Sequence, residues 1–174
     1  MSDTIPHAGV VQFHGEHATL IYERRLRHAP DAVWAAITTP EALTAWFAHR
    51  VTIEPWVGGQ VEMITGPSAF HSTGRVLAWD PPHVFAYEWR VAPRTELPQG
   101  ETESVVRWAL SPTEDGGTVL HFSQQRLTRA TGVGFAPGMH AWLDRLEAHL
   151  DGAPLPDWWG RYQAVAAAYP RWGS

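Results

Sequence analysis

The N-terminal stretch of the chain carries the residues whose types first suggest chemistry. His7, His14 and His17 lie close together in sequence, with Glu16 beside them. A zinc site needs three or four ligands that converge, usually from rigid elements. This stretch has no helical ligand spacing and resembles a flexible N-terminal segment. We therefore expect solvated histidines and no metal site.

Other catalytic signatures are missing from the sequence. There is no Gly-x-Ser-x-Gly elbow of the kind that presents a serine nucleophile, and the Gly58-Gly59 pair is typical of a turn. The chain contains neither cysteine nor lysine, which excludes thiol chemistry, Schiff bases and a phosphate-loop lysine. The sequence predicts no catalytic residue and no cofactor, and it leaves open whether the protein is an enzyme.

The more serious polar candidates lie on predicted strands. Tyr87 and Gln124 are in phase with apolar neighbours and are expected to point inward, whereas Arg107 and His121 are out of phase and should face solvent. An inward tyrosine can act as a general acid, contact a ligand, or hydrogen-bond the backbone.

Charge and composition argue against two classes of partner, nucleic acids and membranes. The net charge of −5 argues against nucleic acid, because that binding depends on Lys and Arg displacing counterions. The dense basic stretch from Glu23 to His28 should alternate along a strand, which predicts a solvated face. No apolar run approaches the roughly 20 residues that span a bilayer, and no secretory signal is recognisable. These features, with the lack of cysteine, predict a cytoplasmic protein without membrane insertion.

The elements that would position these residues follow from periodicity and turn signals. A strand at 20–26 precedes two short helices, which begin at Pro30 and at Pro40, with Thr39 as the cap of the second. Six further segments with strand patterns and short turns then predict an antiparallel meander, namely 51–54, 60–65, 74–79, 84–91, 104–110 and 118–123.

A long amphipathic helix is expected after Gly132 and Gly134. Its apolar face is formed by Met139, Leu143, Leu146 and Leu150, with Trp142 beside them. Its opposite, polar face is formed by Asp144, Glu147 and Asp151. Asp157 can then cap a last helix with a stripe of Trp158, Tyr162, Val165 and Tyr169.

The long helix is the element able to cover the apolar face of the sheet, and a curved sheet around a helix leaves a space typical of ligand sites. Ten tryptophans suit either such a cavity or an aromatic core. The candidate ligand-binding residues are Phe85, Tyr87, Trp89, Trp108, Phe122, Gln124, Met139 and Leu143. Each of them could instead be plain core.

Three stretches carry a resemblance to a known family. They are the helix pair at 30–47, the hairpin at 74–82 with 85–89, and the closing helix at 139–150. In this order they resemble the START-like, or helix-grip, SRPBCC superfamily, and more narrowly its bacterial proteins similar to the activator of the heat-shock chaperone ATPase. The resemblance implies an α+β fold, with a curved antiparallel sheet of about six or seven strands wrapped on a long C-terminal helix.

The resemblance also implies a domain organisation and a function. It implies one START-like domain over 1–174, with a core at about 19–150, an N-terminal extension at 1–18 and a Trp-rich helical tail at 151–174. Where relatives often carry a histidine after the last strand, this chain has Gln124. The expected function is non-catalytic binding of a small hydrophobic or amphipathic molecule, lipids included, as a carrier or sensor. The alternatives are an aromatase/cyclase-type enzyme and a chaperone-cofactor-like interaction module linked to the stress response. A homodimer and a chaperone partner stay open.

Overall fold

The computed structural model describes residues 5–171. The strands are β1 (Val10–His14), β2 (His17–Leu26), β3 (Ala48–Ile53), β4 (Gln60–Thr65), β5 (Phe70–Asp80), β6 (Val84–Val91), β7 (Glu101–Pro112) and β8 (Thr118–Thr128). The helices are α1 (Pro30–Thr38), α2 (Pro40–Trp46), α3 (Arg129–Leu150) and α4 (Trp158–Val165), the last followed by the short 3-10 helix η1 (Ala166–Ala168).

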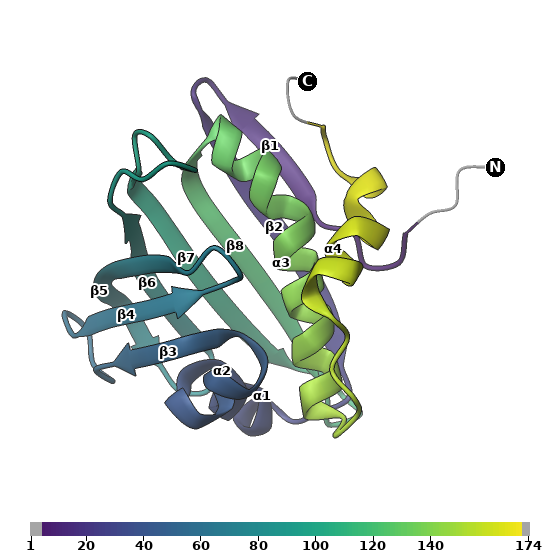
Figure 1. The fold of residues 1–174 in the computed structure, drawn as a ribbon. Coiled ribbons are helices and arrows are strands. Elements are labelled where there is room, and N and C mark those ends of the chain that lie inside the picture. The colour runs from purple at the N-terminus through teal and green to yellow at the C-terminus, as the bar shows by residue number, and fades with distance from the viewer. Residues whose placement is uncertain (1–4, 172–174) are drawn as a thin grey trace.

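All eight strands form one antiparallel sheet in the order β1-β2-β8-β7-β6-β5-β4-β3. The sheet is curved and does not close on itself, and α3 lies across its concave side (Figure 1). The predicted α+β helix-grip class is confirmed. The sheet has eight strands and not six or seven, because the segment that was expected to be flexible forms β1, which pairs with β2.

The two short helices begin where the prolines predicted. Pro30 and Pro40 occupy first-turn positions, where a missing N–H costs no helical hydrogen bond. Thr39 does not cap α2 with its side chain, contrary to the prediction. It also ends α1, and its hydroxyl donates to the carbonyl of Ala35 instead. The buried Trp46 donates its indole N–H to Ala36 at 2.9 Å, which fixes α2 against α1.

Helix α3 begins earlier than the sequence suggested. Thr128 caps it by accepting from the N–H of Thr131, and the buried carboxylate of Glu101 accepts from both the N–H and the hydroxyl of Thr128. Gly132 therefore lies inside the first turns and not before them. A Cβ at this position would lie 2.5 Å from the Cβ of Ala18, so glycine permits close contact between α3 and β2.

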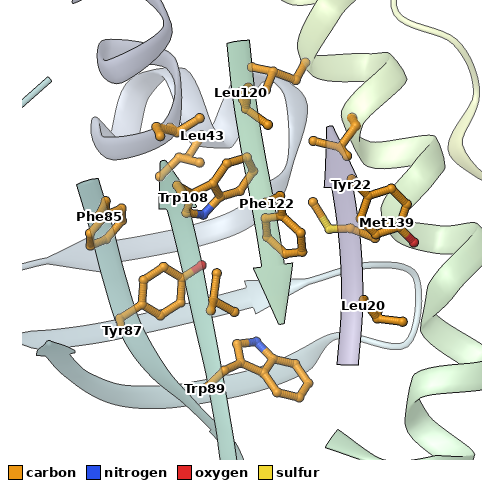
Figure 2. Close-up of a cluster of buried hydrophobic side chains, with 14 of the residues drawn as sticks. Leu20, Tyr22, Leu43, Phe85, Tyr87, Trp89, Trp108, Leu120, Phe122 and Met139 are labelled. Atoms are coloured by element: carbon orange, nitrogen blue, oxygen red, sulfur yellow. The ribbon is translucent and has the colours of Figure 1, made fainter. Parts of the chain in front are cut away.

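The hydrophobic core lies between the concave face and α3 (Figure 2). Phe85, Tyr87, Trp108 and Phe122 alternate along their strands with outward residues, as the period of two requires. Met139 and Leu143 meet them from α3. Within residues 5–171, no helix is long and apolar enough to cross a membrane.

Candidate functional site

The eight candidate ligand-binding residues are all buried between the sheet and α3. Seven of them belong to one continuous apolar cluster, and Gln124 stands opposite two of its members, Leu20 and Val106. Their rings touch one another: the centroids of Phe85 and Tyr87 are 4.8 Å apart, and those of Trp108 and Phe122 are 4.7 Å apart. The strands thus bring the predicted residues together, and whether they line a ligand site stays a prediction.

Neutral polar groups interrupt this aromatic surface. The amide of Gln124 donates to the hydroxyl of Ser104 at 3.2 Å, and both residues are buried. Burial raises the pKa of Tyr87 to about 12, although a hydrogen bond with Trp108 opposes the shift. Tyr87 therefore stays neutral and can offer a hydroxyl, as a donor or an acceptor, to a molecule bound beside it.

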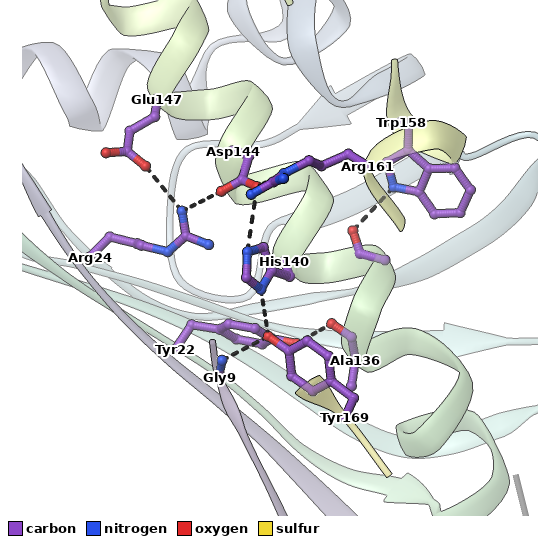
Figure 3. Close-up of polar contacts among 11 residues, drawn as sticks. Gly9, Tyr22, Arg24, Ala136, His140, Asp144, Glu147, Trp158, Arg161 and Tyr169 are labelled. Carbon is purple, nitrogen blue, oxygen red and sulfur yellow. Dashed lines mark hydrogen bonds and ion pairs between the residues drawn. The ribbon is translucent and has the colours of Figure 1, made fainter. Parts of the chain in front are cut away.

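A charged cluster, which sequence reasoning missed, lies where β2, α3 and α4 meet (Figure 3). Arg24 is 2% exposed, and its Nη1 donates to Asp144 at 2.8 Å and to Glu147 at 3.0 Å. Arg161 of α4 donates to the second oxygen of Asp144 at 2.5 Å. We call these four residues the charged junction.

The charged junction corrects two expectations. Arg24 was expected on a solvated strand face, and Asp144 on the free side of the closing helix. Arg24 is instead in phase with Leu20 and Tyr22, whose side chains point inward. Asp144 and Glu147 face β2 and α4 because α4 covers that side of α3. The phase of Arg24 with its apolar neighbours was the signal that could have revealed it.

Asp144 is held ionised by its neighbours. Burial raises its pKa, but the hydrogen bonds and charges of Arg161 and Arg24 outweigh burial, so the pKa lies below its ordinary value. Two nitrogens of Arg24, Nε and Nη2, are buried without a hydrogen-bond partner among the residues described. The arginine is therefore strongly dependent on the carboxylates that it does reach.

His140 connects this cluster to Tyr169, near the end of the described chain, and through Tyr169 to Gly9, near its start. Its Nδ1 lies 2.8 Å from the hydroxyl of Tyr169, and its Nε2 lies 3.4 Å from Asp144. The same Tyr169 hydroxyl accepts from the N–H of Gly9, while the hydroxyl of Tyr22 donates to Ala136. This chain of contacts fixes the segment after α4, and the start of β1, against α3.

Burial lowers the pKa of His140 from 6.5 to about 4. The negative charge of Asp144 opposes this shift, but the positive charges of Arg24 and Arg161 offset that effect. The unfolded chain then takes up a proton at higher pH than the folded one. The free energy of unfolding should be nearly constant above about pH 7 and fall by about 2 kcal/mol between pH 7 and pH 5. Chemical unfolding of the wild type and of His140→Gln at the two pH values measures this.

The matched control for this pH dependence is His149→Gln, on the same helix. It should keep the wild-type slope, whereas His140→Gln should lose most of it. An unchanged slope in His140→Gln would assign the pH dependence to other groups.

The N-terminal histidines lie at the edge of the sheet. His14 ends β1 and His17 begins β2, and the Nε2 of His17 pairs with Glu103 at 3.0 Å. In the part of the chain that the structure describes, no three His, Asp or Glu residues are grouped where they could hold a metal ion. Arg107 and His121 are exposed on the sheet face turned away from α3, as their strand phase predicted.

Comparison with known proteins agrees with this architecture. CalU16 from Micromonospora echinospora is 21% identical, with 94% of each chain covered and a TM-score of 0.70, which shows the fold. The protein MLL2253 from Mesorhizobium loti is 27% identical over 79% of this chain and 99% of its own, with a TM-score of 0.67. A Bordetella parapertussis protein, encoded by BPP1335, is 22% identical over 97% and 92% of the chains, with a TM-score of 0.69. No curated protein matches the sequence.

The family described as Activator of Hsp90 ATPase homolog 1-like protein matches residues 27–151, which includes α1, α2, strands β3 to β8 and all of α3. The structural neighbours share the fold of this chain. The predicted resemblance is confirmed, and the chain belongs to the Activator of Hsp90 ATPase homolog 1-like family.

Proposed function

We propose that this domain binds a small, neutral, amphipathic molecule between the concave face of the sheet and α3, as a carrier or sensor without catalysis of its own. The fold and family support a ligand-binding SRPBCC domain. The observation that supports a neutral, amphipathic ligand is the buried, uncharged pair of Gln124 and Ser104 beside the buried aromatic side chains. Such isolated polar groups in an apolar surface are what orient a bound molecule in a protein site.

The chemistry of the interior defines the ligand. The residues around Tyr87, Trp108 and Phe122 are aromatic or aliphatic, and the inward polar pair beside them, Gln124 and Ser104, is uncharged. The inward Arg24 on β2 is already paired with Asp144 and Glu147. A charged ligand group placed there would lose its hydration without an opposite charge to replace it. A planar or flexible apolar body with one hydroxyl or carbonyl fits this surface best. Met139 can adjust its flexible side chain to ligands of different shape.

Paired probes test this proposal. Naphthalene and 1-naphthol differ by one hydroxyl, and both should quench part of the tryptophan emission in a saturable manner. Gln124→Leu should weaken 1-naphthol binding by about tenfold and leave naphthalene binding almost unchanged, because it removes only a hydrogen-bonding group. Trp108→Arg should abolish quenching by both probes, provided that circular dichroism shows it folded.

His121→Leu is the control on the outward face of the same strand, and it should bind both probes as the wild type does. Absence of saturable quenching by either probe would defeat the proposal. An equal loss of affinity for naphthalene and 1-naphthol in Gln124→Leu would also defeat it. Extraction under denaturing conditions from the native host, followed by mass spectrometry, would then identify the natural ligand.

A second candidate function is a cyclase-type enzyme, and the contact between Tyr169 and His140 favours it. A hydrogen-bonded Tyr–His pair beside the carboxylate of Asp144 has the components of a proton relay. The imidazole is fully buried, so a substrate would need an opening to reach it. Reproducible turnover of a cyclisable polyketide-like substrate, lost in Tyr169→Phe with the fold intact, would replace the carrier proposal.

The family description names an activator of a chaperone ATPase, and a chaperone partner remains a proposal for this chain. Trp159 is 53% exposed and stacks on Tyr162, which gives α4 an apolar surface that a protein partner could cover. A role in the cytoplasmic stress response depends on that interaction. Stimulation of a purified chaperone ATPase by this domain, reduced in Trp159→Ser, would support it.

A further inference from the structure

A wide hollow lies on the face of the sheet that is turned away from α3. It has a volume of about 970 Å³ and crosses β1, β2, β8 and β7. We name it the outer groove, and its lining includes Gln12, Thr19, Glu103, Arg107, Ser123 and Arg126 beside three histidines. The strand phase separates it from the interior, since Arg107 and Ser123 alternate with the inward-facing Trp108 and Phe122.

Two positive charges in the outer groove are exposed to solvent and have no protein partner among the described residues. Arg107 and Arg126 are exposed, and neither forms an ion pair or hydrogen bond with any residue in 5–171. The groove also holds the carboxylate of Glu103, 3.0 Å from the Nε2 of His17, so its two arginines against one carboxylate leave a net charge of +1 with histidines counted as neutral. The groove therefore concentrates positive charge on a chain whose net charge is −5.

A β-bulge places Arg126 in the groove. Leu20 pairs with Gln124 and Ala18 pairs with Leu127, so Gln125 and Arg126 together stand opposite Thr19. Both of these residues are exposed, and Arg126 has a φ of 58°, a left-handed conformation that residues with a Cβ rarely adopt. The bulge turns a second consecutive side chain outward, where regular alternation would bury it.

Neutral donors complete the surface between the two arginines. Ser123 pairs with Arg107 across β8 and β7, and its hydroxyl lines the groove together with that of Thr19 and the amide of Gln12. Arg126 lies three residues along β8 from Ser123, the partner of Arg107, and the bulge shortens the backbone separation along the sheet to about 7 to 10 Å at 3.3 Å per residue. Two long arginine side chains that start from backbone positions this far apart can reach a single ligand from both ends.

We propose that the outer groove binds a small phosphorylated molecule, with Arg107 and Arg126 as the phosphate ligands. Guanidinium groups form strong, often bidentate hydrogen bonds with phosphate oxygens, and the hydroxyl donors extend the contact. The volume is within the range of small-molecule sites. An acidic side chain bounds the positive area on one side, since Glu23 stands opposite His121 on the same face of the sheet. This confinement fits a small ligand and opposes a nucleic-acid strand.

Titration calorimetry with inorganic pyrophosphate tests the site in low-salt buffer, because salt screens exposed charges. We expect saturable binding with one site per chain. Arg107→Gln and Arg126→Gln should each weaken it by at least tenfold. Both side chains are exposed, so both variants should fold, and thermal melting checks this.

Arg50→Gln is the matched control, an exposed arginine on β3 at the far end of the sheet, and it should change the affinity less than twofold. Citrate tests whether the site selects phosphate or any anion. Weak citrate binding supports the proposal, and citrate binding as tight as pyrophosphate overturns the phosphate assignment. Absence of saturable binding, or an equal loss in Arg50→Gln, overturns the site. Pyrophosphate should not change the quenching by naphthalene. This result would show that the outer groove and the interior site bind independently.

Discussion

Leu143→Asp should lower the free energy of unfolding by at least about 3 kcal/mol. Leu143 is 1% exposed and lies in the middle of α3 against the concave face of the sheet. The substitution removes buried apolar volume and places a carboxyl group where no residue of opposite charge can pair with it. For a domain of this size the loss corresponds to a fall in Tm of about 10 °C.

The matched control for this substitution is Ala130→Asp, on the same helix. Ala130 is exposed in the first turn of α3, where a carboxylate suits the helix dipole, so its Tm should stay near the wild-type value. Equal melting temperatures for the two variants would show that α3 packs on the sheet through a different face.

Much of the architecture could be predicted from local patterns. The prolines at 30 and 40 marked the starts of both short helices, and the two-residue period identified which side chains of β6, β7 and β8 point inward. Asp157 was identified as the cap of α4, and it accepts from the N–H of Gly160. These features depend on residues near one another in sequence, which is why the sequence alone revealed them.

The errors arose where distant segments meet. Gly132 was taken as a break before the closing helix, but it is needed for close contact with Ala18 on β2. The polar side of the helix was assigned to solvent because its pattern was amphipathic, and the pattern does not show that α4 returns to cover it. The bulge at Arg126 likewise depends on pairing between β8 and β2. Periodicity shows which side of an element is buried, as it did for Arg24, but it does not show which distant segment covers that side.

Asp144→Ala should destabilise the fold by about 3 kcal/mol, although a pattern of helix phase alone would predict little effect. The substitution leaves Arg24 buried with Glu147 as its remaining partner and leaves Arg161 without its carboxylate. Removing one partner of a buried ion pair has a large effect because the other charge stays desolvated. Urea unfolding at pH 7 measures the change, and Glu23→Ala, at an exposed neighbour of Arg24, should change stability by less than about 0.5 kcal/mol.

A double-mutant cycle separates the two arginines that share Asp144. Arg161→Gln should cost less than Arg24→Gln, because the side chain of Arg161 is 37% exposed and water can replace part of its contact. In each cycle the arginine substitution should have a smaller effect once Asp144 is alanine, with a coupling of about 1 to 3 kcal/mol for Arg24. Strictly additive effects would mean that the charges do not interact. In that case, neutral packing alone would hold α3 between β2 and α4.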